Sequence, residues 1–324
     1  MTNRLRTTLG LVREIVVFGG SAHPALAAEI CSHLDVPVRP VRLTRFANDC
    51  LEVQLLANCR ERDVFVIQPL GPPVQENLVE LLLMLDAARG ASAARVTAVM
   101  PYYAYARSDK KSMPRISIGG RLVADLLATA GASRVLTMTL HAPQVHGFFS
   151  VPVDHLNALR EFATHFSRLD LGNFVVVSPD LGNAKNAAAL ARMLQLPVAA
   201  GAKERHSDQQ VTISSIIGDV TGRDVIVLDD EIARGTTIIE LLDRLRERDV
   251  RSVRIACTHG LFSDGALTRI AAEPLVREIV CTNTLPVASE GDIELQVISV
   301  APALAEAIRR IHEGESVSAL FGAS

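Results

Sequence analysis

The chain alternates short apolar runs with stretches of helical periodicity, and this alternation limits the folds open to it. The apolar runs include Ile15–Phe18, Val64–Ile67, Val96–Met100 and Val135–Thr139, and Val79–Ala88 is a helical stretch between two of them. Runs that are apolar throughout are typical of parallel strands buried on both faces, with crossover helices between them. The pattern therefore predicts an α/β fold with mostly parallel sheets flanked by helices.

The alternation also repeats weakly at an offset of about 160 residues. Segment 62–67 reads Arg-Asp-Val-Phe-Val-Ile and segment 223–228 reads Arg-Asp-Val-Ile-Val-Leu. Convergence is the alternative explanation, because any two α/β units share this alternation of strands and helices. We favour two tandem copies of one α/β domain. We expect the first at residues 1–157, the second at 158–302, and the C-terminal helix in 303–324 packing back on the first.

Composition excludes several classes of protein. With 48% hydrophobic residues the chain can bury a large core, and a net charge of −3 disfavours binding of nucleic acid through a general basic field. Five cysteines without a C-x-x-C spacing disfavour a zinc ribbon or a secreted disulfide framework. No apolar run reaches the roughly 18 residues that span a bilayer. We expect a cytoplasmic enzyme that binds neither membrane nor nucleic acid.

The strongest candidate site follows the run Val225–Leu228, where two carboxylates, Asp229 and Asp230, stand side by side. A turn rich in small and hydroxyl residues comes next, and a helix is expected from about Ile238. The turn consists of Ala233, Arg234, Gly235, Thr236 and Thr237. Carboxylates can accept ribose hydroxyl protons, and a turn at a helix N-terminus can hold a phosphate. The alternative is a solvated turn with a threonine N-cap, which would leave the acid pair unexplained.

Two further strand ends carry polar residues, His141 after Val135–Thr139 and Asp180 after Phe174–Ser178. Each is more often a capping or core residue when taken alone, but together they could be ligands of Mg²⁺ beside a nucleotide. The sequence contains neither a P-loop nor a G-x-G-x-x-G fingerprint after a strand. The segment from Tyr102 to Lys111 concentrates aromatics and cations, which suits a triphosphate and base stacking, with an exposed polar loop as the alternative.

Taken in order, these segments resemble the ribose-phosphate pyrophosphokinase (phosphoribosyl pyrophosphate synthetase) family, of which the chain would be a divergent member. The resemblance is carried by Asn77-Leu78, Pro101-Tyr102, residues 140–149, Ser178-Pro179-Asp180, Asp229-Asp230, residues 258–263 and residues 315–321. It implies two phosphoribosyltransferase-type domains and transfer of the diphosphoryl group of ATP to the anomeric hydroxyl of ribose 5-phosphate, with Mg²⁺. It also implies a homo-oligomer built from dimers, usually a hexamer.

The resemblance assigns roles to particular residues. Lys203 and Arg205 would be catalytic and lie on a mobile flap over the transferring phosphates. The ATP-binding residues would be Phe46, Asn48, Arg107, Asp109, Lys110 and His141, with Phe46 stacking on adenine across a subunit interface. His141 and Asp180 would stand around the metal. Asp229 and Asp230 would hold the ribose hydroxyls, and the 233–237 turn the 5-phosphate.

The sequence departs from the family pattern in four places. The sugar-phosphate turn usually reads Asp-Thr-Gly-Gly-Thr, whereas Arg234 here adds a cation that we expect either to contact the 5-phosphate or to point to solvent. Asn48 stands where an acid usually reads the adenine amino group, Ser108 replaces a glutamine, and Glu204 replaces an arginine. Two alternatives follow: a catalytically weak or silent companion subunit, and, with less support, a phosphoribosyltransferase.

Overall fold

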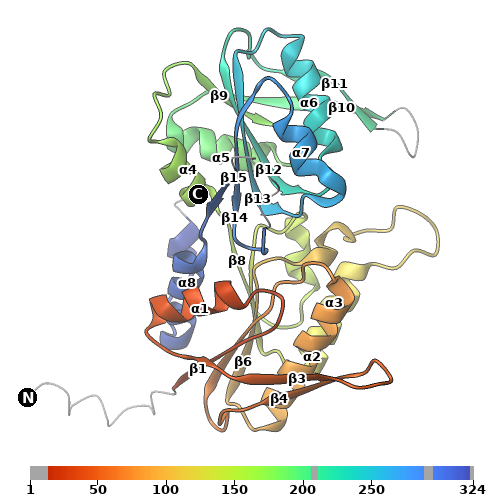
Figure 1. Ribbon diagram of the computed structural model, residues 1–324, viewed down its shortest axis with the longest axis vertical. Coiled ribbons are helices and arrows are strands. Elements are labelled where there is room, and N and C mark those ends of the chain that lie inside the picture. Colours follow the sequence, from red (N-terminus) through yellow and green to blue (C-terminus); the bar gives the residue numbers. More distant parts are fainter. Residues whose placement is uncertain (1–13, 206–210, 288–294, 322–324) are drawn as a thin grey trace, which may run out of the picture. The chain divides into compact units, whose positions relative to one another are not determined.

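The computed structural model describes residues 14–205, 211–287 and 295–321, and the chain forms two compact units (Figure 1). Unit 1 contains the chain up to Leu156 together with the segment from Ala301 onward, and unit 2 contains Asn157–Val300. Unit 2 is therefore contiguous in sequence, whereas unit 1 is completed only by the last helix of the chain.

Unit 1 is built on a six-stranded parallel sheet in the order β2-β1-β5-β6-β7-β8, with a separate antiparallel ribbon, β3-β4. Its strands are β1 (Ile15–Gly19), β2 (Val38–Arg39), β3 (Val41–Arg45), β4 (Leu51–Leu55), β5 (Asp63–Ile67), β6 (Arg95–Met100), β7 (Arg134–Met138) and β8 (Val153–Leu156). Its helices are α1 (Pro24–Leu34), α2 (Val74–Gly90), α3 (Gly119–Ala130) and α8 (Ala301–Glu313), with 3-10 turns η1 (Ala104–Arg107), η2 (Pro143–Phe148) and η4 (Ser318–Phe321).

Unit 2 is built on a seven-stranded sheet in the order β11-β10-β9-β12-β13-β14-β15, in which only the edge strand β11 runs antiparallel to its neighbour. Its strands are β9 (Phe174–Ser178), β10 (Val198–Arg205), β11 (Val211–Ile217), β12 (Asp224–Ile232), β13 (Ser252–Gly260), β14 (Val276–Thr282) and β15 (Leu295–Ile298). Its helices are α4 (Leu159–Phe166), α5 (Ala184–Leu194), α6 (Thr236–Arg246) and α7 (Ala266–Ala271), with the 3-10 turn η3 (Ser263–Gly265).

The two units repeat one topology, as the sequence offset predicted. Without β11, the strand order of unit 2 matches that of unit 1 one for one. The final helices are exchanged: α8 follows β15 in sequence but packs on α1 of unit 1, and α4 follows β8 but packs on α5 of unit 2. The chain therefore consists of two α/β copies, with mostly parallel sheets flanked by helices.

An ion pair between an arginine and a buried aspartate is repeated along with the topology. In unit 1 the Arg95 guanidinium donates to both carboxylate oxygens of Asp63, whose side chain is fully buried, with an Nε–Oδ1 distance of 3.1 Å. In unit 2 Arg251 contacts Asp224 in the same two-pronged way, with the same Nε–Oδ1 distance of 3.1 Å. Convergence would explain a shared alternation of strands and helices. It would not explain the same arginine–aspartate pair at the start of corresponding strands.

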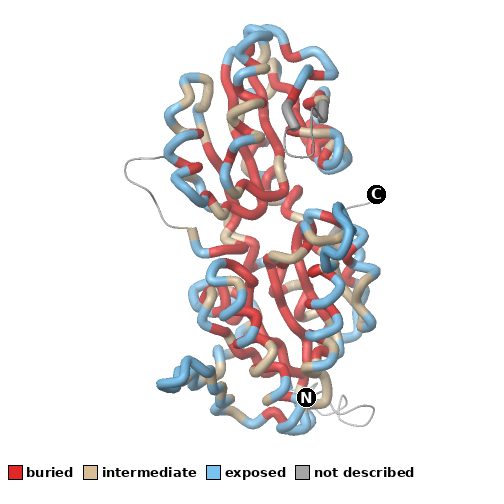
Figure 2. The backbone as a smooth tube through the Cα atoms, turned by 90° about the vertical axis from the view of Figure 1, so that its right-hand side faces the viewer, coloured by how far each residue is buried: buried red, intermediate tan, exposed pale blue. Residues whose placement is uncertain are grey.

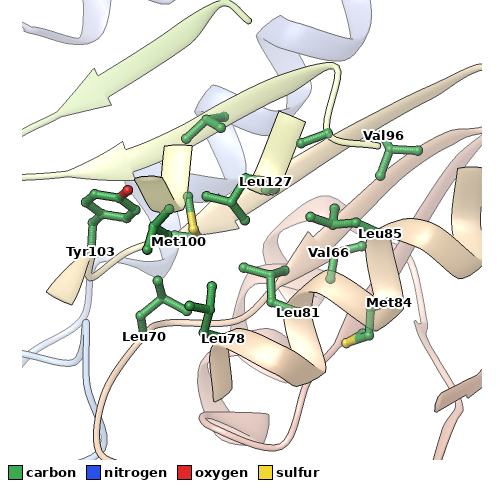
Figure 3. Packing of buried hydrophobic residues seen from close by; sticks show 14 of the residues in the cluster. Val66, Leu70, Leu78, Leu81, Met84, Leu85, Val96, Met100, Tyr103 and Leu127 are labelled. Atoms are coloured by element: carbon green, nitrogen blue, oxygen red, sulfur yellow. The ribbon is translucent and has the colours of Figure 1, made fainter. Parts of the chain in front are cut away.

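Buried aliphatic side chains fill the space between each sheet and its helices, and Figure 2 shows the buried residues concentrated along the strands. In unit 1, Leu81 and Leu85 of α2 lie beside Val66 of β5 (Figure 3). Burying each leucine fully contributes roughly 1.5–3 kcal/mol relative to leaving it exposed. Helix α2 is longer than the periodic stretch that the sequence predicted. Its first turn, before Leu78, was missed because it faces partly outward and lacks the apolar pattern.

Candidate active site

The acid pair of unit 2 lies within strand β12 and not after its end, which corrects the prediction. β12 continues to Ile232, which pairs with Gly260 of β13, because the neighbouring strand extends equally far. Asp229 and Asp230 therefore occupy the carboxyl-terminal half of a central strand, where the backbone is held by the sheet. In open parallel sheets this edge is where ligands bind.

A third acid of unit 2, Asp180, lies near enough for its charge to act on Asp229. It follows β9, the strand next to β12, and its Oδ1 accepts from the backbone amides of Gly182 (2.9 Å) and Asn183 (3.2 Å). The Asn183 side chain in turn donates to the Leu228 carbonyl at 2.9 Å, which ties this loop to β12. The loop after β9 is thus fixed against the strand that carries the acid pair.

The charge of these acids is concentrated enough to change their ionisation. Burial raises the pKa of Asp229 well above its usual value, and the neighbouring charge of Asp230 and that of Asp180 raise it further. The amide of Asp230 donates to Asp229 Oδ1 at 2.9 Å, which favours the charged form and opposes part of this effect. Asp229 is therefore poised to gain from any cation or hydroxyl donor that approaches it.

The turn after β12 opens helix α6, and it is tighter than predicted. Gly235 is the N-cap with a positive φ of 72°, and the helix begins at Thr236. The threonine N-cap considered above is therefore wrong: Thr236 and Thr237 lie inside the first turn, and no side chain caps the helix. Glycine is favoured here because the φ of Gly235 lies in the left-handed region, which a residue with a Cβ adopts only with strain.

Arg234 points outward and is held by an acid from another loop. Its side chain is 76% exposed, and its Nε donates to Oδ2 of Asp264 at 3.1 Å. Asp264 lies in the loop after β13 with a positive φ of 56°. The two loops come from neighbouring strands, so the turn and this acid meet at one edge of the sheet. An exposed pair of this kind is worth at most about 1 kcal/mol, which a phosphate can outcompete.

The corresponding edge of unit 1 carries a network of hydrogen-bonded side chains in place of the acid pair. By the sequence repeat, Gln68 stands where Asp229 stands in unit 2. Its amide accepts from the backbone of Ala22 (3.0 Å) and donates to Glu80 (2.8 Å), and Glu80 also accepts from the amide of Ser21 (2.8 Å). Ser21, Ala22 and Glu80 line a small pocket at this place, which carries a hydrogen-bonded amide where unit 2 has an acid. Among the residues that the structure describes, only the second copy therefore carries an acid pair at this edge.

Two residues predicted to bind the base lie at the tip of the β3-β4 ribbon of unit 1. Phe46 is 48% exposed, so its ring is accessible. Asn48 is exposed, and its Oδ1 atom accepts from the amide of Cys50 at 3.2 Å, so its side-chain nitrogen is the group that can donate. Arg45 pairs with Asp49 across the turn and with Glu76 of α2, which anchors the ribbon.

The loop after β6 is only partly as expected. Tyr102 and Tyr103 are buried, and Tyr103 donates its hydroxyl to the Gly120 carbonyl at 2.7 Å, so neither ring is available to stack on a base. Arg107 is exposed at the end of η1, and Lys110 is exposed three residues later.

Asp109 and His141 belong to the same edge of unit 1. The carboxylate of Asp109 accepts from the amide of Gln144 on η2, so the loops after β6 and β7 are joined. His141 lies exposed just before η2. Because His141 belongs to unit 1 and Asp180 to unit 2, their joint role at a metal stays a prediction.

Up to residue 205, the segment predicted to form the flap is part of strand β10. Strands β10 and β11 pair antiparallel, with Lys203 opposite Ile213 and Arg205 opposite Val211. The side chains of Lys203 and Arg205 lie outside the described part of the structure, so their roles stay predictions. A shift in the pairing after Ala202 marks where the hairpin leaves the regular sheet.

Sequence reasoning missed Asp264 and Arg269. Arg269 of α7 donates to the backbone carbonyls of Arg234, at 2.8 Å, and of Asp264. No local motif marks either residue, since their importance arises from two loops that are some 30 positions apart. Asp264 has a positive φ, which aspartate tolerates better than most residues, but that conformation is visible only in the structure.

Within the described ranges, no three His, Cys, Asp or Glu side chains are grouped so as to hold a metal ion by themselves. Likewise, none of the helices described is both long and apolar enough to cross a bilayer.

Comparison with known proteins gives consistent matches over almost the whole chain. Residues 15–131 match the N-terminal domain of ribose phosphate pyrophosphokinase, and residues 207–322 match the phosphoribosyl synthetase-associated domain. A protein of Streptomyces coelicolor is 70% identical over 96% of this chain and 99% of its own length. The ribose-phosphate pyrophosphokinase of Deinococcus radiodurans is 48% identical, covering 95% of this chain and 98% of its own.

Among solved structures, phosphoribosylpyrophosphate synthetase from Mycobacterium smegmatis superposes with a TM-score of 0.87 at 39% identity, over 93% of this chain and 100% of that one.

Proposed function

Because the chain belongs to the ribose-phosphate pyrophosphokinase family, we propose that the acid pair and turn of unit 2 form its ribose 5-phosphate site. The enzyme transfers the diphosphoryl group of ATP to the anomeric hydroxyl of ribose 5-phosphate, giving phosphoribosyl pyrophosphate and AMP. One observation carries the placement: Asp229 and Asp230 lie in the carboxyl-terminal half of a central strand, which leads into a tight turn that opens a helix.

The two ends of this site suit the two ends of the sugar. Asp229 and Asp230 would accept hydrogen bonds from the ribose hydroxyls, and those bonds would favour the ionised form of Asp229 that burial disfavours. The 5-phosphate would lie against the turn, where the first amides of α6 and the helix dipole attract an anion. Arg234 would leave Asp264 for the phosphate, exchanging an exposed carboxylate for a more highly charged partner.

ATP would be bound by residues of unit 1, with the base at the tip of the β3-β4 ribbon. Phe46 offers an exposed ring for stacking, and the donor amide of Asn48 would favour a base that presents an acceptor there. Relaxed nucleotide specificity follows from this replacement of an acid by an amide. The phosphate-side residues of this proposal are Arg107, Asp109, Lys110 and His141.

The carboxylates of unit 2 also suit Mg²⁺. This ion prefers oxygen ligands and is usually held by one or two carboxylates together with substrate phosphates, so a complete protein cage is not required. Asp180 and Asp229 offer such oxygens. Burial, the charge of Asp230 and, to a smaller extent, the charge of Asp180 raise the pKa of Asp229, as expected for a site that gains from a cation. When bound, Mg²⁺ would neutralise charge on the transferring phosphates. Lys203 and Arg205 would be the catalytic cations over the bridging oxygen.

The protein would act as a homo-oligomer in the cytoplasm, built from dimers and usually a hexamer. Two kinds of exposed apolar residue support association: Phe46 at the ribbon tip, and Leu122 and Leu126 one turn apart on α3, which are 54% and 39% exposed. Size-exclusion chromatography with light scattering measures the state directly, and a monomer at assay concentration contradicts it.

The decisive experiment uses purified protein with ATP, Mg²⁺ and ribose 5-phosphate, and follows AMP and phosphoribosyl pyrophosphate. Both products should appear in equal amounts, and Asp230→Asn should raise the KM for ribose 5-phosphate. GTP and CTP in place of ATP test the consequence of Asn48. No product with any nucleotide would favour a silent companion subunit.

A further inference from the structure

Helix α7 supports the sugar-phosphate turn from behind. A Cβ placed on Gly235 would lie 2.9 Å from Cδ1 of Ile270 and 3.4 Å from Cβ of Ala266, so α7 touches the backbone of the turn. Arg269 projects from the same helix. The turn therefore has a packing contact and a polar contact with one element of unit 2.

The polar contact uses both terminal nitrogens of one guanidinium. Arg269 donates from Nη2 to the backbone oxygen of Arg234 at 2.8 Å and from Nη1 to the backbone oxygen of Asp264. The side chains of Arg234 and Asp264 form the exposed pair described above. The loops after β12 and β13 are thus joined twice. The rigid fork of arginine can reach two carbonyls at once, which the single ammonium of lysine does less well.

Fixing the direction of the Arg234 carbonyl also fixes the direction of a hydrogen-bond donor, the amide of Gly235. A peptide unit is planar and trans, so its C=O and the next N–H point in opposite directions. With the carbonyl directed at Arg269, the Gly235 amide must point away from α7. The backbone of Gly235, with a φ of 72°, would itself permit this peptide to rotate, because glycine tolerates both hands of φ. The orientation therefore depends on Arg269.

We propose that Arg269 is a positioning residue for ribose 5-phosphate: it holds the Arg234–Gly235 peptide so that the Gly235 amide faces the 5-phosphate. The inference rests on the proposed placement of that substrate and adds a residue that touches no reacting atom.

Steady-state kinetics of Arg269→Gln and Arg269→Lys test it. Arg269→Gln should raise the KM for ribose 5-phosphate about tenfold, equivalent to about 1.4 kcal/mol, and leave the KM for ATP within about twofold. Arg269→Lys should recover part of the loss, because it keeps the charge and one donor. Arg246→Gln is the matched control. It removes an exposed arginine of unit 2 that pairs with Asp243 at 2.9 Å and lies on α6, and it should change neither KM.

The outcomes separate the two proposals. If the native enzyme binds ribose 5-phosphate but Arg269→Gln leaves its KM unchanged, or raises both KM values equally, the positioning role is wrong. If Asp230→Asn also leaves the KM for ribose 5-phosphate unchanged, the placement of the sugar phosphate is wrong as well. Thermal unfolding of Arg269→Gln checks that the variant is folded. If it is fully folded and its KM for ribose 5-phosphate has not risen more than its KM for ATP, the inference is overturned.

Discussion

Replacing Gly235 with alanine isolates what the sugar-phosphate turn requires of its backbone. The residue has a φ of 72°, and the new Cβ would lie 2.9 Å from Cδ1 of Ile270. The left-handed conformation costs alanine about 1–2 kcal/mol. Overpacking against the buried Ile270 adds about 1–3 kcal/mol. We therefore expect Gly235→Ala to lower the free energy of unfolding by about 2–5 kcal/mol.

Gly222 offers a matched control in the same unit. Its φ is 66°, but nothing lies within 4 Å of an added Cβ, so Gly222→Ala should cost only the conformational part. Urea unfolding of the two variants gives the difference. Ile270→Val removes Cδ1, and in a double-mutant cycle it should recover much of the steric part for Gly235→Ala. Equal destabilisation by both alanine variants, or no coupling to Ile270→Val, would refute the reasoning.

Three further predictions concern charge and stacking. Asp229→Asn should abolish turnover yet raise Tm at pH 7–8. The folded state raises the pKa of Asp229, so keeping this carboxyl group in the fold costs stability at a pH above its ordinary pKa of 3.8. Calorimetry should therefore show the gain in Tm shrinking as the pH falls towards 3.8. Asp264→Asn should lower the KM for ribose 5-phosphate and make it more sensitive to salt, because Arg234 is released; an unchanged KM argues against contact between Arg234 and the 5-phosphate. Phe46→Ala should raise the KM for ATP about tenfold by removing base stacking, and it should leave the KM for ribose 5-phosphate unchanged. A rise in both KM values would indicate a structural role for Phe46 instead.

The sequence was sufficient wherever short-range pattern and repetition decide the structure. The strand runs and the duplication lie where the alternation placed them, and the acid pair of Asp229 and Asp230 lies in the predicted strand region although inside the strand. The end of β12 was misplaced because a strand extends as far as its neighbour does, and Ile232 is held by Gly260 from another part of the chain.

Contacts between distant segments could not be predicted at all. The aromatic run after β6 looked like a stacking surface, but tertiary packing buries Tyr102 and Tyr103. The pairing of Arg234 with Asp264 and the bridge from Arg269 depend on loops of two adjacent strands. Such contacts exist only once the sheet has formed, so no local spacing in the sequence predicts them.

The exchanged final helices have a consequence for synthesis. The ribosome releases unit 2 as one uninterrupted segment, whereas unit 1 waits for Ala301–Glu313 to cover α1. Leu304, Ile308 and Ile311 of that helix are buried, so until they emerge the nascent first half exposes an apolar face. Truncation of the chain near residue 300 should therefore damage the half that was made first, and a chaperone that binds exposed apolar surface would be needed for longest at the N-terminal half.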